Sequence, residues 1–354
     1  MVTDVVHVIV WSVSVLLIAA TLLPVVRSAK WWVRLWDYPR LQLAVALAVV
    51  AGAQLLLLPG GLPTGALLAA TAGCLAWQLY HMYPYTPLAR VQVTQAADPD
   101  SEAALGIVVA NVLQQNREAT AFLQRVRDAD PDIVLAVETD EWWDAQIACL
   151  QERYPYVVRH PLDNTYGMHL FSRFVLEDVR LQERVSSQIP SLTAGVRLRS
   201  GKLVTLHCVH PEPPQPGNDV EERDAELLLV AREVASKRGS TIVCGDLNDV
   251  AWSSTTRLFQ RISGLLDPRV GRGSYPTFHA RHWLARWPLD HIFLDASFRL
   301  QRLEVLGAFG SDHFPVHVRV VHDASAVHDH DIEPATADDQ QRADEKIADG
   351  QQAG

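Results

Sequence analysis

The chain has 354 residues and a formal net charge of −10 at pH 7. This length accommodates one large domain or two modest ones with accessory segments. The acidic balance argues against a protein that holds nucleic acid on a broad basic surface. It does not exclude a nuclease, because bound cations offset the acidity of a phosphoester site.

Three long apolar runs lie in the first ninety residues. They are Val5–Val26, Leu41–Leu58 and Thr64–Tyr83. Each is about as long as a helix that crosses a 30 Å hydrocarbon core. The N-terminus has no basic segment of the kind that precedes a signal peptide, so the first run reads as an uncleaved span. We therefore expect a three-span transmembrane anchor at 1–90 in an inner or plasma membrane; a buried helical hairpin of a soluble protein is the alternative.

The loop between the first two runs carries four basic residues, Arg27, Lys30, Arg34 and Arg40. The loop between the second and third runs carries no Lys or Arg. Basic loops of multi-pass proteins tend to remain in the cytoplasm. With three spans, this rule predicts a cytoplasmic C-terminal domain.

Residues 91–103 are polar and contain Pro99, which is typical of a short linker. The region 104–321 alternates between strand-like and helical patterns, which indicates an α/β fold. The expected strands are Gly106–Asn111, Ile133–Val137, Met168–Phe171, Leu176–Arg180, Thr193–Leu198, Leu203–His207, Ser240–Cys244, His291–Leu294, Leu300–Leu306 and Val316–Val320. The expected helices are Ala119–Ala129, Trp142–Arg153 and Val220–Arg238.

The C-terminal region 322–354 is rich in Asp, Glu, Gln and Ala, and we expect it to be a disordered polar tail. Its His-Asp tract at 328–331 is interpreted as solvated rather than as a metal site. The four cysteines, at 74, 149, 208 and 244, show no CxxC spacing. Buried free thiols are the expectation, with a disulfide or a metal site as the alternative.

Apolar strands of the domain repeatedly end in a carboxylate, an amide or an imidazole. The residues in question are Asn111, Glu138, His207 with His210 just beyond it, and Asp246. Strand ends of this kind meet at one edge in many α/β folds. Oxygen ligands suit Mg²⁺ or Mn²⁺, a carboxylate suits the activation of water, and imidazoles suit donation to a phosphate. Together these groups favour metal-dependent phosphoester hydrolysis.

The same motifs, in the same order, resemble those of the endonuclease/exonuclease/phosphatase superfamily. They are N-x4-N from Asn111, the strand-terminal Glu138, G-x4-SR from Gly167, His210-Pro211, GDLN at 245–248, D-x-I-x-L from Asp290 and SDHFPV from Ser311. Gly167-Met168-His169 stands where the family often has Gly-x-Ala. The resemblance covers 104–321 and implies a four-layer α/β sandwich, two packed β-sheets flanked by helices.

The resemblance also implies a role for each matching residue. The metal ligands would be Glu138 and Asn111, with Asp312 nearby. Asp246 would activate the attacking water, and Asn248 would contact the scissile phosphate. His313 would contact or protonate the phosphate, oriented by Asp290, and His210 would lie near the phosphate. His169 and His207 fall outside this pattern and are assigned no role.

Three functions remain open on the sequence. The first is a membrane-anchored phosphatase on a lipid-linked phosphoester, and the second is a membrane-tethered nuclease on DNA or RNA. The third is a non-catalytic membrane module, against which the complete set of site residues speaks. Bacterial members of the teicoplanin-resistance type have a similar three-span layout and place the catalytic domain outside, contrary to the charge-based orientation.

Overall fold

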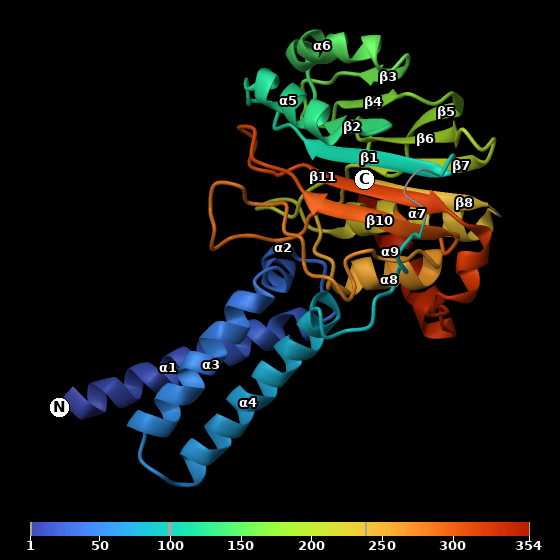
Figure 1. Cartoon of the computed structure of the whole chain (residues 1–354). Helices are drawn as coiled ribbons and strands as arrows, with labels where there is room; N and C mark the ends of the chain where they lie inside the picture. The colour runs from blue at the N-terminus through green and yellow to red at the C-terminus, as the bar shows by residue number, and fades with distance from the viewer. Residues whose placement is uncertain (1, 98–100, 238, 354) are drawn as a thin grey trace.

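A bundle of three long helices projects from a layered α/β domain (Figure 1). The computed structural model describes residues 2–97, 101–237 and 239–353. The helical elements of the N-terminal part are α1 (Val2–Leu22), η1 (Leu23–Val25), α2 (Trp31–Arg34), η2 (Leu35–Asp37), α3 (Arg40–Leu57), α4 (Leu62–Met82) and η3 (Tyr83–Tyr85).

The three long helices are long and apolar enough to cross a membrane. Large apolar side chains such as Leu56 and Leu62 are exposed on the outside of the bundle. Inside it, Gln54 Nε2 donates to Ser14 Oγ at 2.8 Å and to Thr71 Oγ1 at 2.9 Å. Hydrogen bonds between apolar helices of this kind hold membrane bundles together. The helices agree within a few residues with the three apolar runs of the sequence.

The domain contains a six-stranded and a five-stranded mixed β-sheet. The first has the order β10-β11-β1-β2-β4-β3 and the second β5-β6-β7-β8-β9. The strands are β1 (Ala104–Asn111), β2 (Ile133–Val137), β3 (Tyr156–His160), β4 (Met168–Ser172), β5 (Leu176–Glu183), β6 (Pro190–Arg197), β7 (Leu203–Val209), β8 (Ser240–Asp246), β9 (Asp290–Leu294), β10 (Phe298–Val305) and β11 (Val316–His322).

The two sheets pack face to face, and helices cover both outer faces. Side chains from both sheets, such as Ile107 and Leu206, share one buried core. Helices α5 (Ala119–Ala129) and α6 (Glu141–Ile147) cover the six-stranded sheet, around Phe122 and Trp143. Helices α7 (Glu221–Ser236), α8 (Ser254–Ser263) and α9 (Ala337–Ala353) lie on the five-stranded sheet. The expected four-layer α/β sandwich is thereby confirmed.

Some local expectations differ from the structure. The expected helix Trp142–Arg153 is α6 followed by a 3₁₀ turn, η4 (Ala148–Glu152). The segment expected to be a free linker packs on the domain, because Val93 is fully buried and Gln95 forms a parallel bridge with Leu300. Cys74, Cys208 and Cys244 are buried free thiols, as expected, whereas Cys149 is exposed.

The C-terminal tail is folded, which corrects the expectation of disorder. After the turn η5 (Ala324–His328), α9 packs on α7 and α8, with Ala343 and Ile347 buried. Ion pairs fix the helix on both neighbours: Lys346 Nζ lies 2.6 Å from Asp224 Oδ2, and Arg261 Nη2 lies 2.8 Å from Asp339 Oδ1. A short apolar stripe and two ion pairs thus hold α9 on the domain, although the composition of the tail is mostly polar.

The His-Asp tract is folded as well, so the solvated interpretation is wrong for one of its histidines. His330 is buried, its Nδ1 lies 2.8 Å from Ala296 O, and its Nε2 accepts from Thr94 N at 3.0 Å. The imidazole therefore links the tail to the segment before β1.

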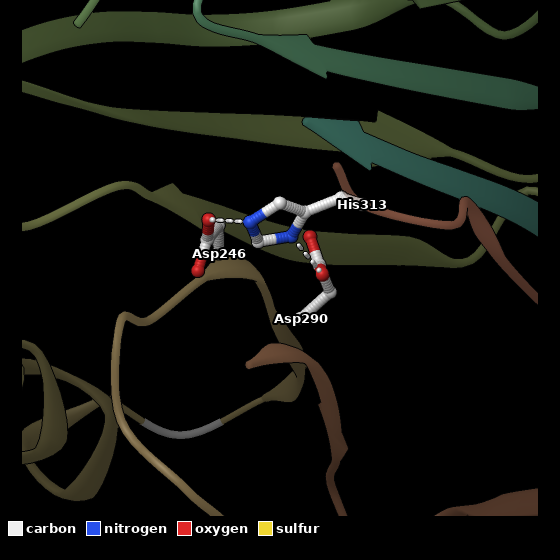
Figure 2. Close-up of side chains that lie close together, drawn as sticks. All are labelled: Asp246, Asp290 and His313. Carbon is white, nitrogen blue, oxygen red and sulfur yellow. Dashed lines mark hydrogen bonds and ion pairs between the residues drawn. The ribbon is translucent and has the colours of Figure 1, made fainter. Parts of the chain in front are cut away.

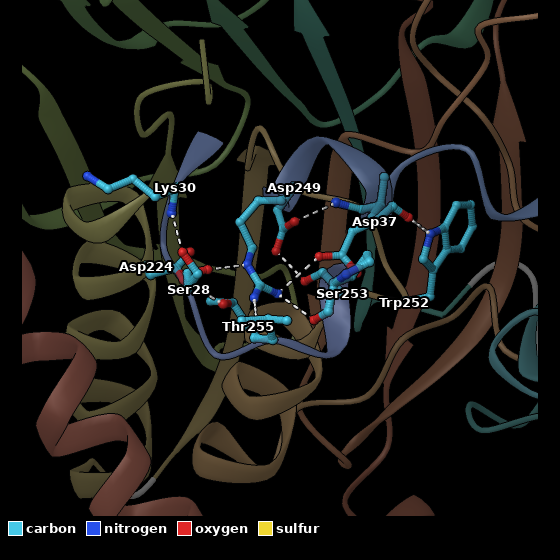
Figure 3. A network of polar contacts seen from close by, with 12 residues as sticks. Ser28, Lys30, Asp37, Asp224, Asp249, Trp252, Ser253 and Thr255 are labelled. Atoms are coloured by element: carbon cyan, nitrogen blue, oxygen red, sulfur yellow. Dashed lines mark hydrogen bonds and ion pairs between the residues drawn. The ribbon is translucent and has the colours of Figure 1, made fainter. Parts of the chain in front are cut away.

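Several hydrogen bonds join the helical bundle to the domain, and three of them involve one loop, residues 247–253 between β8 and α8; Figure 3 shows Trp252 of this loop beside Asp37. Tyr38 Oη donates to Asn248 O at 2.7 Å, and Tyr85 Oη donates to Ala251 O at 2.8 Å. Trp252 Nε1 donates to Asp37 O at 2.7 Å. The ends of the apolar helices are thus packed on the loop that directly follows Asp246.

Candidate active site

Strand register brings the polar strand ends to one edge of the sandwich. Strands β1 and β2 are parallel and pair Asn111 with Val137, the residue before Glu138. Strands β7 and β8 are also parallel and pair Val209 with Gly245. Strand β9 runs antiparallel to β8 and pairs Asp290 with Asp246. Because the two sheets face each other, the ends of all these strands open on one site.

Asn111 joins the two sheets at this edge. Its Nδ2 donates to Glu138 Oε1 at 2.6 Å and to Asp246 Oδ2 at 3.0 Å. Gln114 N donates to the other Glu138 oxygen at 3.2 Å, and Leu113 N donates to Asn111 Oδ1 at 2.9 Å. One amide therefore holds a buried and a partly buried carboxylate together, which gives an oxygen-rich cluster of the kind that hard divalent cations prefer.

The backbone at this edge is held in uncommon conformations. Glu138 and Asn248 have φ of 63° and 50°, in the left-handed region that non-glycine residues rarely adopt. Gly245, with φ of 146°, lies so close to β7 that a Cβ there would be 1.9 Å from Val209 O. The left-handed conformations of the two non-glycine residues cost about 1–3 kcal/mol each, and such conformations cluster at functional sites. They direct Glu138, Asp246 and Asn248 into one space.

His313 lies between two aspartates (Figure 2). Its Nδ1 lies 2.8 Å from Asp290 Oδ2, and its Nε2 lies 3.6 Å from Asp246 Oδ2. Thr277 Oγ1 accepts from Asp290 N at 3.1 Å, and Ser311 Oγ accepts from His313 N at 3.0 Å. The carboxylate of Asp290 thereby fixes the orientation of the imidazole, as in other Asp–His pairs.

The protonation of these groups follows from burial and from the neighbouring charges. Burial raises the pKa of Glu138 to about 7. Burial also raises the pKa of Asp246. Burial opposes a charge on His313, but the two aspartates outweigh it and raise the pKa of the imidazole to about 10. Burial lowers the pKa of His210 to about 4. At neutral pH the site therefore contains one charged and one neutral imidazole.

The other candidate residues have more specific contacts. His210 is buried, with Nε2 3.9 Å from Asp246 Oδ2 and Nδ1 without a partner among the described residues. Asn248 Nδ2 donates to Pro211 O at 2.9 Å and so fixes the loop that carries His210. Asp312 is half-buried, and its Oδ1 lies 3.5 Å from Ser311 Oγ. In the described parts of the chain, no hydrogen bond joins Asp312 to Glu138.

Three side chains near the site were missed by sequence reasoning. Thr277 and Phe278 lie in an irregular segment before β9, where Phe278 contacts the ring of His313 at 5.0 Å between centroids. The ring of Tyr166 lies 5.4 Å from that of His210. No periodicity or motif marks these positions, so their roles emerge only from tertiary packing.

The sequence comparison agrees with the fold and with the residues that meet at this edge. Residues 108–313 match the Endonuclease/Exonuclease/phosphatase family. The chain belongs to this family, whose members are generally metal-dependent hydrolases of phosphoester bonds. The comparison with curated proteins gave no match.

Solved structures with the same fold share low sequence identity with this chain. Humanized TDP2 from D. rerio is 17% identical, with a TM-score of 0.54 over 62% of this chain and 99% of that chain. The human Nocturnin catalytic domain with bound sulfate is 16% identical, with a TM-score of 0.51 over 63% of this chain and 95% of that chain. An endonuclease/exonuclease/phosphatase from Beutenbergia cavernae is 18% identical, with a TM-score of 0.50 over 62% of this chain and 72% of that chain. These similarities establish the fold.

Proposed function

We propose that this protein is a membrane-anchored, Mg²⁺- or Mn²⁺-dependent phosphoesterase that acts on a lipid-linked phosphoester. The family membership supplies the reaction class. The observation that carries the membrane part is that the segment between the first two of three span-length helices is hydrogen-bonded to the loop after Asp246, through Tyr38 and Trp252. A hydrolytic site attached in this way lies close to the surface where a lipid-linked substrate resides.

Glu138 and Asn111 are the proposed ligands of the divalent cation, with Asp312 nearby. The oxygen-rich cluster fits such an ion, since Glu138 and Asp246 share the Nδ2 of Asn111, and the charged imidazole of His313 beside Asp246 is already paired with Asp290. A bound cation would neutralise charge on the phosphate. Asp246, Asp290 and His313 also offer atoms within 4.8 Å of one another. We assign this second group to proton handling, because the imidazole Nδ1 is already engaged by Asp290.

The chemistry of the chain's own residues follows from their charges. Asp246 is the proposed base that orients and deprotonates the attacking water. His313, charged at neutral pH, donates from Nε2 to the phosphate, while Asp290 holds its other nitrogen. Neutral His210 and the amide of Asn248 are the proposed contacts of the phosphate oxygens.

An exposed segment beside the site, 279–287, supports the proposal that the substrate is linked to a lipid. Its Trp283 and Leu284 are 76% and 62% exposed. Gln42 Nε2, at the start of α3, donates to Leu284 O at 2.7 Å. The segment therefore lies near the level at which α3 leaves the domain, where aromatic side chains favour a membrane interface.

A tethered nuclease is the second candidate, favoured by the same segment for a different reason. Arg281 and Arg286 lie among its aromatic residues, a combination that also suits single-stranded nucleic acid. The deciding experiment is hydrolysis by the solubilised full chain with Mg²⁺ or Mn²⁺. The panel contains polyprenyl pyrophosphate, inositol phosphates, and single- and double-stranded DNA. We expect turnover of the lipid-linked substrate; turnover of DNA alone would establish the nuclease instead, and activity unaffected by EDTA would contradict the proposal.

A further inference from the structure

A cavity of about 670 Å³ lies at the junction of the helical bundle and the domain. The residues that line it come from both parts of the chain. The bundle contributes the segment 24–29 after α1, with Trp77 and His81 near the end of α4. The domain contributes residues of α7, α8 and α9. Asp246 and His313 are not among the lining residues, so this cavity is separate from the candidate active site.

Basic side chains outnumber acidic ones in the lining. The basic residues are Arg27, Arg34, Arg40, Arg257, Arg261, Arg342 and Lys346, and the acidic residues are Asp37, Glu221, Asp224, Glu345 and Asp349.

Much of the acidic charge is already neutralised by ion pairs. Asp37 is paired with both Arg34 and Arg40. Asp224 is paired with Lys346 and also with Arg223 outside the lining.

Positive charge without a partner remains on this lining. Arg257 and Arg342 are half-buried, and their side chains form no hydrogen bond or ion pair with any described residue. Arg40 is buried, and its Nε has no partner in the described parts of the chain. Glu221, Glu345 and Asp349 lie in the same lining without an ion pair to either arginine. A guanidinium group has five donors, and leaving them unmet in a partly buried place is unfavourable. The lining therefore fits a phosphate-bearing anion.

The position of the cavity along the candidate membrane spans indicates where such an anion would come from. The first candidate span ends at Val25 and the third at Tyr85. Residues 24–29 and Trp77 and His81 thus place the cavity where two spans end, at the level of lipid headgroups. We propose that this cavity binds the phosphate of an anionic phospholipid headgroup. This inference rests on the proposed membrane anchoring, but not on the proposed hydrolysis.

The test measures binding of fluorescent phosphatidylglycerol to the detergent-solubilised full chain. EDTA is present throughout, so that hydrolysis does not enter. The test variant is Arg257→Gln with Arg342→Gln. The matched control is Arg127→Gln with Arg180→Gln, which removes the same charge from exposed positions on α5 and β5. Thermal unfolding without lipid checks that both variants are folded, and Arg342→Gln alone serves if the double variant is not.

We expect saturable binding that weakens about 10- to 100-fold in the test variant, because each lost charged hydrogen bond contributes substantially. The control variant should bind like the wild type. Equal weakening in the control, or equal binding of phosphatidylcholine, would show general charge attraction and overturn the site. Inorganic phosphate that competes at the same concentration as the lipid would overturn the lipid source. A chain that is soluble without detergent would instead refute the anchoring, whereas an integral membrane chain that binds no phosphatidylglycerol refutes only this site.

Discussion

Asp290 is the side chain whose role is most sharply defined by its contacts. Its Oδ2 lies 2.8 Å from His313 Nδ1, and its backbone N–H is held by Thr277. Asp290→Asn keeps the shape but removes the charge that stabilises the imidazolium. We expect kcat to fall by about 10²–10⁴-fold, with the apparent affinity for Mg²⁺ almost unchanged. A fall in kcat that high Mg²⁺ restores would instead make Asp290 a metal ligand.

The buried carboxyl of Glu226 on α7 should make the stability of the protein depend on pH. Its side chain is buried, Oε1 has no partner among the described residues, and burial raises its pKa to about 8. The folded state therefore prefers the protonated form, so stability is greatest below the unfolded pKa of about 4.3 and decreases as pH rises toward 8. Glu226→Gln should remove this decrease and add about 2–4 kcal/mol at pH 9. The measurement is denaturant unfolding from pH 5 to 9.

The control for Glu226 is the exposed Glu152, changed to Gln. This variant should follow the pH dependence of the wild type. If Glu226→Gln is no more stable than wild type at pH 9, the buried carboxyl is compensated by a neighbour such as Arg184.

At the scale of elements, the accuracy of sequence reasoning depended on how a segment is buried. Helix α5 and strand β2 were predicted at their observed bounds, because their apolar periods are separated by the turn Asp130-Pro131-Asp132. Strand β3 was missed because it is only partly buried. Helix α8 was missed because its buried apolar side chains are few and stand among polar residues. They are Leu258, Phe259 and Ile262.

The sequence predicted which residues belong to the candidate site, but not which of them contact one another. Strand-end positions and motifs pointed to Asn111 and Asp246 separately. Their hydrogen bond crosses between two sheets, and no local pattern encodes which sheet faces which. The roles of the individual residues in metal binding and catalysis remain predictions.

Helix α9 gives a direct test of the folded tail. Ile347 is 6% exposed and packs with Leu228 and other side chains of the α7–α8 cluster. Ile347→Ala should lower the free energy of unfolding by about 2–3 kcal/mol, measured by denaturant unfolding of the full chain. Gln351→Ala, on the exposed side of the same helix, should have almost no effect. Equal stability of both variants would mean that α9 does not pack in solution.

At the scale of the whole molecule, the basic residues of the loop that predicts the orientation also form ion pairs within the protein. Arg34 and Arg40 are both paired with Asp37, and Lys30 Nζ lies 2.6 Å from Asp219 Oδ2. Charges that are neutralised within the protein contribute less to retention on one side of a membrane. The cytoplasmic orientation therefore rests mainly on Arg27, which has no partner among the described residues.

The side of the membrane on which the domain lies can be measured with a reporter fused to the C-terminus of the full chain. With a cytoplasmic domain, a fused green fluorescent protein should fluoresce and a fused alkaline phosphatase should be inactive. The reverse pattern would place the domain outside, as in the bacterial members with a similar three-span layout. The hydrolytic proposal is unaffected by either result, because the site lies within the domain.

The central claim, metal-dependent hydrolysis with distinct roles for two carboxylates, is tested by kcat as a function of Mg²⁺ concentration. Glu138→Gln should need far more Mg²⁺ and recover activity partly at high concentration, because it removes charge that offsets the cation. Asp246→Asn should lose about 10²–10⁴-fold in kcat, without rescue by metal. Circular dichroism confirms that both variants are folded. Rescue of Asp246→Asn but not of Glu138→Gln would exchange the two roles, and full activity of both variants would contradict the account.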